Sequence, residues 1–233
     1  MDIRQASITP VHGYFIVLEG TDGSGLSTQT ARLRDALLTA GRAAFLTKEP
    51  SDGPAGGLIR LALTHRLGTA PHTSHAPGSD QPGDRWAPLG DEVMALLFAA
   101  DRLDHLRQEI EARLARGVDV VCDRYRLSSL AYQSLGADIA WIAALNSKAR
   151  RPDLTIFLDV PPEVCAQRMA QRGGAVELYE QQDKIRRIRE NYLRLIAQAP
   201  PNEQIVPVDG RGTADQVAAL VWAACKAALH GLS

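Results

Sequence analysis

The sequence predicts a three-layer α/β fold, in which a five-stranded parallel sheet is flanked by helices. Two observations support this prediction. The strand candidates are continuous apolar runs without polar alternation, which is typical of strands that are covered on both faces. Segments with helical periodicity separate these runs, as in consecutive βαβ units. We expect the strands at residues 14–18, 43–47, 118–122, 154–160 and 205–208.

The ends of the expected helices carry capping residues. Gly41 and Gly117 stand where two helices should end, because glycine readily takes the left-handed conformation of a helix terminus. Pro162 suits the first turn of another helix. Thr213 and Gln216 form a capping-box pattern at the start of the last helix. These residues fall where the apolar pattern also places helix boundaries.

Length and charge restrict the possible classes of protein. The 233 residues suit a single domain spanning residues 1–233. The balance of 26 Lys and Arg against 27 Asp and Glu argues against a nucleic-acid coat, so we expect no nucleic-acid partner. The three cysteines lack the CxxC spacing of a zinc site. Residues 1–12 hold no apolar run behind a basic patch, and residues 217–229 are too short to span a bilayer. We therefore expect a cytoplasmic protein without a membrane partner.

Residues 64–90 interrupt the alternation of strands and helices. The segment contains four prolines with several glycines and serines, which is typical of a long loop. It also contains His65, His72 and His75, so a metal site is one interpretation. A solvated loop is the favoured interpretation, because no carboxylate or cysteine joins these histidines at ligand spacing.

The strongest local signal is a strand that runs into a glycine-rich turn and then into a helix at about residues 27–40. The phosphate-loop motif G-x-x-x-x-G-K-[ST] fits residues 20–27 at every position except the lysine, where Leu26 stands. Glycines let backbone N–H groups cradle phosphate oxygens, and the helix N-terminus adds a positive dipole end. A purely structural glycine turn is the alternative. The candidate phosphate-binding residues are Gly20, Asp22, Gly23, Ser24, Gly25, Leu26, Ser27 and Thr28.

Several further blocks occur in a fixed order along the chain. They are EGTDGSG at 19–25, KEP at 48–50, LLFAADR at 96–102, DRY at 123–125, SSLAYQ at 128–133 and PDLTIFLDV at 152–160. This ordered set resembles the thymidylate kinase family of P-loop nucleoside monophosphate kinases. The resemblance implies a P-loop NTPase fold with a lid, transfer of the ATP γ-phosphate to dTMP with Mg²⁺, and a homodimer.

The helix expected at residues 91–116 supplies part of the proposed substrate site. At about 100° per residue, Phe98 and Arg102 fall together, away from the centre of the apolar stripe that we predict to face the core. A ring one turn from a guanidinium suits a stacked base and a bound monophosphate, with a plain packing contact as the alternative for Phe98. The stripe consists of Val93, Leu96, Leu97, Ala100, Leu103, Leu106, Ile110 and Leu114.

The resemblance implies roles for further residues of the substrate site. Asp22 would accept the deoxyribose 3′-hydroxyl, and Tyr132 would crowd the 2′ position and so disfavour ribose. Ser129 and Gln133 would lie near the edge of thymine. The candidate substrate-binding set is completed by Lys48, Glu49, Phe98, Arg102 and Arg124.

Asp123 and Arg124 follow a buried strand, at the edge of a parallel sheet where ligands bind. Asp123 and Ser27 are the candidate Mg²⁺ ligands, and Arg124 is a candidate to bridge phosphates, with a structural ion pair as the alternative. The resemblance also implies a mobile basic lid, here residues 168–180. Arg172, beside a Gly-Gly pair, is the first candidate for a catalytic lid arginine and Arg168 the second.

Leu26 is the main departure from the motif. Loss of one preorganised donor typically lowers a rate by about 10²–10³-fold. Three functions therefore stay open from the sequence: a nucleotide kinase in which an arginine or Lys48 replaces the missing lysine, a nucleotide-binding protein with little catalysis, or a deoxynucleoside kinase.

Overall fold

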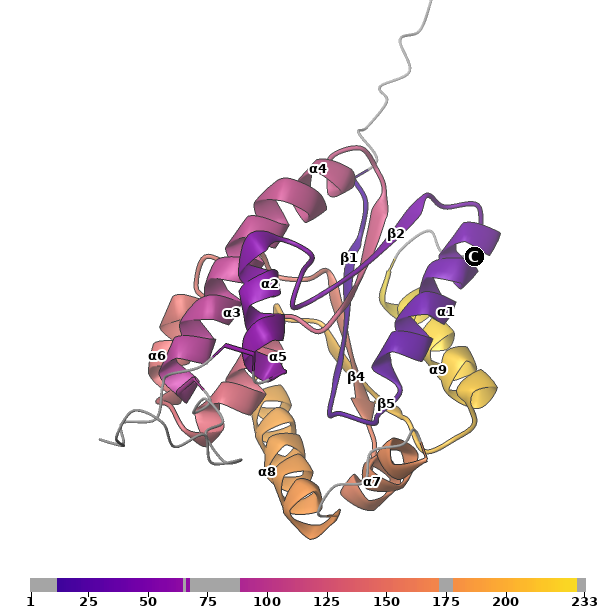
Figure 1. The fold of residues 1–233 in the computed structure, drawn as a ribbon. Helices are drawn as coiled ribbons and strands as arrows, with labels where there is room; N and C mark the ends of the chain where they lie inside the picture. The colour runs from indigo at the N-terminus through magenta and orange to yellow at the C-terminus, as the bar shows by residue number, and fades with distance from the viewer. Residues whose placement is uncertain (1–11, 65, 68–88, 172–177, 230–233) are drawn as a thin grey trace, which may run out of the picture.

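The computed structural model describes residues 12–64, 66–67, 89–171 and 178–229 (Figure 1). In this part of the chain the five predicted strands form one parallel sheet with the order β2-β3-β1-β4-β5. Each strand lies within two residues of its predicted bounds. The strands are β1 (Phe15–Gly20), β2 (Ala44–Lys48), β3 (Asp119–Asp123), β4 (Leu154–Asp159) and β5 (Ile205–Asp209).

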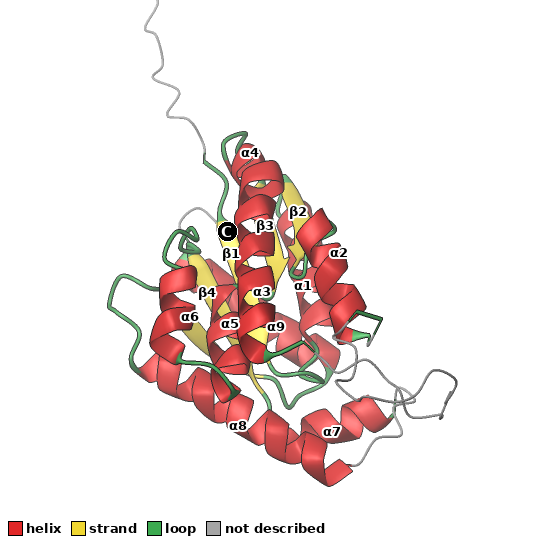
Figure 2. Cartoon of the chain, turned by 60° about the vertical axis from the view of Figure 1, so that its left-hand side comes forward, coloured by secondary structure: helices red, strands yellow, loops and turns green. Residues whose placement is uncertain are grey.

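Helices cover both faces of the sheet, as the continuous apolar strands predicted (Figures 1 and 2). On β1, Ile16 and Leu18 pack into a core beneath α1 and α9, whereas Phe15 and Val17 pack on the opposite side. The first face carries α1 (Leu26–Thr39) and α9 (Ala214–Ala228). The second face carries α2 (Pro54–Leu63), α3 (Asp91–His105), α4 (Glu111–Leu114), α5 (Arg126–Tyr132), α6 (Ile139–Leu145) and α8 (Leu178–Ala197). The short α7 (Pro162–Ala170) follows β4.

The predicted helix ends are confirmed. Gly41 and Gly117 take the positive φ angles of 78° and 77°. Pro162 is the first residue of α7. Thr213 accepts a hydrogen bond from the Gln216 backbone N–H, and the Gln216 side chain accepts one from the Thr213 N–H, so both halves of the capping box are formed.

The predicted apolar stripe of the 91–116 segment is wrong in its first half. Val93, Leu96 and Leu103 are 44, 50 and 42% exposed. The segment is not one uniform helix, because a π-helical turn at Leu106–Ile110 separates α3 from α4. An extra residue per turn shifts the phase, so one stripe at 100° per residue does not continue through it. The stripe is buried only from the π-helical turn onward, at Leu106, Ile110 and Leu114.

The strand register brings the candidate site residues to one edge of the sheet. Lys48 at the end of β2 pairs with Asp123 at the end of β3, and Asp123 pairs with Leu18 on β1. The phosphate loop leaves β1 two residues later, at Gly20. His65, His72 and His75, together with most of the predicted 64–90 loop, lie outside the described residues. No helix among the described residues combines the length and the apolar character needed to cross a membrane.

Candidate active site

The glycine-rich turn between β1 and α1 has the backbone conformation expected of a phosphate-binding loop. Gly23 and Gly25 have φ angles of 82° and 95°, which side chains rarely allow. A Cβ atom at Gly23 would also lie 2.5 Å from the carbonyl oxygen of Cys165 in α7. The sequence therefore needs glycine here both for the turn and for the close approach of α7.

A cavity of about 330 Å³ opens beside this loop. The Ser27 hydroxyl donates a 2.8 Å hydrogen bond to the Asp123 carboxylate at its edge. Burial raises the pKa of Asp123, and the Ser27 hydrogen bond and the charges of Arg124 and Lys48 oppose this shift. The lining residues are Thr21, Asp22, Gly23, Gly25, Leu26, Ser27, Thr28, Lys48, Glu49, Asp123 and Arg124.

The Ser27 and Asp123 oxygens fit a magnesium site that is completed by substrate. Mg²⁺ is commonly bound by one or two protein oxygens together with waters and substrate phosphates. In P-loop NTPases a loop Ser or Thr and a strand-end Asp share this task. Within the described ranges, no cluster of three or more His, Cys, Asp or Glu side chains could hold a metal alone. A metal here would therefore depend on a phosphate ligand.

A second pocket of about 410 Å³ lies next to the loop cavity. Asp22, Glu49 and Arg124 line both spaces, so the two spaces meet at these three side chains. Of the predicted substrate residues, Lys48 lines only the loop cavity. The others all line the second pocket: Asp22, Glu49, Phe98, Arg102, Arg124, Ser129, Tyr132 and Gln133.

Arg124 is fixed where the two spaces meet. Its φ angle is 68°, a conformation that costs a non-glycine residue about 1–3 kcal/mol. The guanidinium donates to the Gly20 carbonyl at 2.7 Å and to the Asp22 carboxylate at 2.8 Å, and it stacks on the Tyr132 ring at 5.1 Å. Burial lowers the pKa of Arg124, but the nearby Tyr132 and Asp22 side chains raise it and contribute to a net upward shift. The guanidinium of Arg124 therefore stays protonated.

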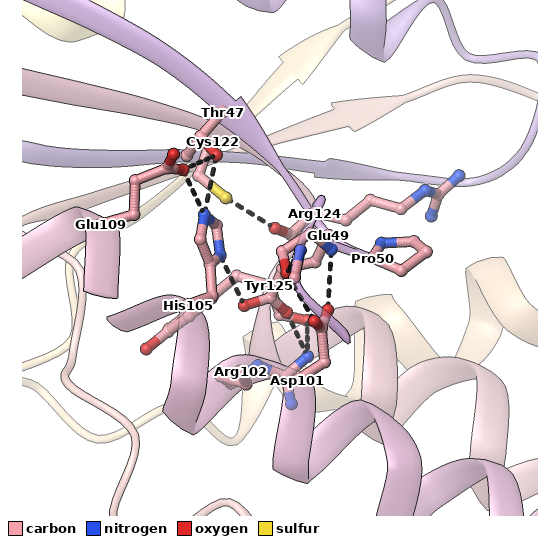
Figure 3. A network of polar contacts seen from close by, with 12 residues as sticks. Thr47, Glu49, Pro50, Asp101, Arg102, His105, Glu109, Cys122, Arg124 and Tyr125 are labelled. Atoms are coloured by element: carbon pink, nitrogen blue, oxygen red, sulfur yellow. Dashed lines mark hydrogen bonds and ion pairs between the residues drawn. The ribbon is translucent and has the colours of Figure 1, made fainter. Parts of the chain in front are cut away.

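Arg102 is held by a buried network (Figure 3). Its side chain is only 1% exposed. The guanidinium donates to Glu49 at 2.6 Å and to the Tyr125 carbonyl at 3.1 Å. It also donates to the Ser129 hydroxyl at 3.1 Å and to the Asn146 side-chain oxygen. The charge predicted to bind the acceptor phosphate therefore lies at the base of the second pocket, oriented by partners from other segments.

His105 extends this network behind Glu49 (Figure 3). Its Nδ1 lies 3.5 Å from a Glu49 oxygen, while its Nε2 lies 3.1 Å from Glu109 and 2.7 Å from the Thr47 hydroxyl. Burial lowers the pKa of His105, but the two carboxylates outweigh burial and raise it above its usual value. A protonated His105 would offset part of the buried negative charge.

Five buried polar atoms on residues that line the second pocket have no hydrogen-bond partner among the described residues. They are one Glu49 carboxylate oxygen, Arg102 Nε, the Tyr125 and Tyr132 hydroxyls and the Gln133 side-chain oxygen. Buried polar atoms without partners are rare, because each one loses its hydrogen bonds to water. Their presence here is consistent with a pocket built for a polar ligand.

The lid prediction is only partly covered by the structure. Arg172 lies outside the described residues. Arg168, at the end of α7, donates to the carbonyls of Ser24 at 3.3 Å and of Gly210 at 2.9 Å. It therefore connects α7 to the phosphate loop and to the turn after β5.

Sequence reasoning missed three groups that support the site. Asn146 and His105 were not predicted, although both contact the network around Arg102 and Glu49. Glu19 was recognised only as part of a motif, yet its buried carboxylate accepts hydrogen bonds from Tyr125 N and from the Tyr192 hydroxyl. Burial raises the pKa of Glu19, and hydrogen bonds from Ser128 and Tyr192 together with the charge of Arg124 oppose the shift. The residues around Asn146 in the sequence do not indicate its role, because it accepts a hydrogen bond from Arg102, which is 44 positions away.

Comparison with known proteins agrees with this geometry. The family model described as "Thymidylate kinase" matches residues 18–218. The chain belongs to the thymidylate kinase family. It is 41% identical over 191 residues to a "Probable thymidylate kinase" of Pyrococcus horikoshii, an alignment that covers 82% of this chain and 86% of the relative. A protein of the same name from Thermococcus kodakarensis is 38% identical over 210 residues, covering 89 and 96% of the two chains.

Proposed function

We propose that this chain transfers the γ-phosphoryl group of ATP to dTMP, giving ADP and dTDP. The observation that carries the proposal is the meeting of two cavities at Asp22, Glu49 and Arg124. One cavity is bounded by the phosphate loop, and the other holds an aromatic side chain and the buried Arg102. Two nucleotides bound in this way would bring a donor and an acceptor phosphate together at a shared wall, as phosphoryl transfer requires.

In this proposal the donor triphosphate occupies the loop cavity. Backbone N–H groups of the loop and the N-terminus of α1 bind its oxygens. Ser27 and Asp123 would hold Mg²⁺, whose charge would neutralise phosphate oxygens of the bound triphosphate. The Ser27–Asp123 hydrogen bond at 2.8 Å supports this role, because both oxygens already converge on one point at the cavity edge.

The acceptor dTMP occupies the second pocket. Phe98 stacks on the base, and Ser129 and Gln133 lie near the thymine edge. The partnerless Gln133 oxygen supports this role, since the thymine N3–H can donate to it. Arg102 binds the monophosphate. Its Ser129 contact at 3.1 Å would couple the phosphate and base ends of the pocket.

The sugar lies between these ends in the proposal. Asp22 accepts the 3′-hydroxyl, while Tyr132 crowds the 2′ position. Arg124 lies against both residues, 2.8 Å from the Asp22 carboxylate, which supports a sugar position beside the transferred group.

Catalysis in this site relies on positioning and charge. The attacking group is an ionised phosphate oxygen of dTMP, so no strong general base is needed. Arg124 supplies positive charge at the shared wall, and Arg172 of the 168–180 lid adds a second guanidinium, with Arg168 as the alternative. Closure of the lid would exclude water and suppress hydrolysis of ATP.

We further propose that residues 1–233 act as a single-domain cytoplasmic enzyme that forms a homodimer. Exposed large apolar side chains on α2 and α3 support the dimer, because clustered apolar surface of this kind usually marks an interface. These residues are Leu58, Leu61, Leu63, Val93, Leu96 and Leu103.

The function is tested with purified protein, Mg-ATP and a panel of acceptors resolved by chromatography. The panel contains dTMP, dUMP, dCMP, dAMP and thymidine. We expect dTDP as the main product. Transfer to thymidine but not to dTMP would instead indicate a deoxynucleoside kinase. Nucleotide binding without transfer to any acceptor would indicate a binding protein.

A further inference from the structure

Position 26 contributes packing, and no charge, to the phosphate loop. The Leu26 side chain is 5% exposed and joins the core cluster that contains Ile16, Leu33 and Val121. The lysine of the usual motif would place an ammonium group near the β- and γ-phosphates. The charge must therefore come from another residue if the loop cavity is to hold a reacting triphosphate.

Two cationic side chains line the loop cavity among the described residues, Lys48 and Arg124. The terminal nitrogens of Arg124 already donate to Gly20 and Asp22. Lys48 is exposed and forms no hydrogen bond or ion pair with any residue that the structure describes. Its ammonium group, on a flexible four-carbon stem with three donors, is thus available to a ligand.

The sheet register places Lys48 at the end of β2, where its side chain lines the loop cavity. It ends β2 and pairs with Asp123, which in turn pairs with Leu18 on β1. Neighbouring strands lie about 4.8 Å apart, so one strand separates Lys48 from the strand that leads into the phosphate loop.

We propose that Lys48 replaces the missing phosphate-loop lysine and binds the transferred phosphoryl group from the opposite wall of the cavity. This inference rests on the proposed function. In the reaction, the bond from the γ-phosphorus to the β–γ bridging oxygen breaks, and a bond to a dTMP phosphate oxygen forms. Lys48 keeps its proton and stabilises the charge on the γ-phosphate oxygens and the ADP leaving oxygen.

The test removes the positive charge at position 48 and introduces one at position 26. The variants are Lys48→Ala, Lys48→Arg, Leu26→Lys and the double variant Leu26→Lys/Lys48→Ala. Lys148→Ala is the matched control, because Lys148 is exposed and lines neither cavity. For each protein, kcat and KM for ATP and dTMP are measured, together with the affinity for Mg-ATP by calorimetry and the melting temperature.

We expect Lys48→Ala to lower kcat by about 10²–10³-fold, the usual effect of removing one preorganised donor. Lys48→Arg should retain most of the activity, and Lys148→Ala should change nothing. The double variant should regain at least about tenfold over Lys48→Ala, because the charge is supplied again from the usual position. Unchanged melting temperatures for the Lys48 variants would show that the fold is intact.

Two results would overturn the assignment: a Lys48→Ala rate within about threefold of wild type, or a double variant that keeps the wild-type melting temperature and is still no faster than Lys48→Ala. A wild-type protein that phosphorylates none of the acceptors refutes the proposed function instead. In that case the Mg-ATP affinity decides the role of Lys48. If Lys48→Ala binds Mg-ATP about tenfold more weakly than wild type, equivalent to 1.4 kcal/mol, Lys48 binds the triphosphate. An unchanged affinity would refute a phosphate-binding role of Lys48.

Discussion

The buried ion pair between Glu49 and Arg102 gives the most quantitative prediction. Both side chains are at most 2% exposed, and their charged atoms are 2.6 Å apart. Glu49→Ala leaves the Arg102 guanidinium buried without a counter-charge next to it. Removing one partner of a buried pair typically destabilises a protein by about 3–5 kcal/mol. In a chain of 233 residues this corresponds to a fall in Tm of roughly 6–20 °C.

The assay is urea and thermal unfolding of Glu49→Ala beside a matched exposed pair. Asp183→Ala removes the partner of Arg186, where the atoms are 2.9 Å apart but both side chains are more than half exposed. Exposed pairs contribute about 0–1 kcal/mol, so this control should change little. Equal effects of the two variants on the free energy of unfolding would refute the reasoning.

A double variant separates the charge effect from lost packing. Glu49→Gln/Arg102→Met removes both charges and keeps similar side-chain volumes. Because no unpaired charge stays buried, we expect this protein to be more stable than Glu49→Ala. A double variant that is less stable than Glu49→Ala would mean that packing, not the unpaired charge, dominates the loss.

The remaining predictions concern pH, the loop and the metal. The pKa of His105 is raised, so its contact with Glu49 stabilises the fold fully below about pH 6.5 and less as pH rises through the folded-state pKa. His105→Asn should reduce this loss in urea unfolding measured between pH 6 and 9, and an unchanged pH dependence would exclude the contact as its source. Gly23→Ala should weaken ATP binding by about tenfold or more, since the φ of 82° costs alanine about 1–3 kcal/mol; unaltered ATP affinity in calorimetry would contradict the strain. Ser27→Ala removes a proposed partner of Asp123 in metal binding and should raise the Mg²⁺ concentration for half-maximal activity by about tenfold. An unshifted magnesium titration would remove Ser27 from the metal site.

The fold was predictable because its signals are local. A buried parallel strand is visible as a continuous apolar run, and the five strands lie within two residues of the predicted bounds. The glycine turns behave likewise, since Gly23, Gly25, Gly41 and Gly117 all take the positive φ angles that their positions require. The parallel register then brings the carboxyl ends of neighbouring strands to one edge of the sheet, so Lys48 and Asp123 lie side by side.

The environment of Arg102 was not predictable in this way. Its partners Glu49, Ser129 and Asn146 are 53, 27 and 44 residues away in the chain. Helical periodicity reports only which residues share a face, so it could not show that the polar face of α3 is the buried one. The π-helical turn after His105 also shifts the helical phase of the side chains, and no residue type in the sequence indicates such a turn.

The backbone strain at Arg124 was likewise invisible in the sequence, because arginine has no preference for a φ of 68°. The structure holds this residue in place through Gly20, Asp22 and Tyr132, which come from two other segments. Such strain commonly occurs at functional sites. It strengthens the candidate role of Arg124 at the wall shared by the two cavities.

The central claim is that the two cavities bind a donor and an acceptor for direct phosphoryl transfer. Its most direct test is incubation of the protein with γ-labelled ATP, Mg²⁺ and dTMP, with the label located by phosphorus NMR or chromatography. We expect the label on the β-phosphate of dTDP. Label released only as inorganic phosphate, with dTMP unchanged, would contradict the claim.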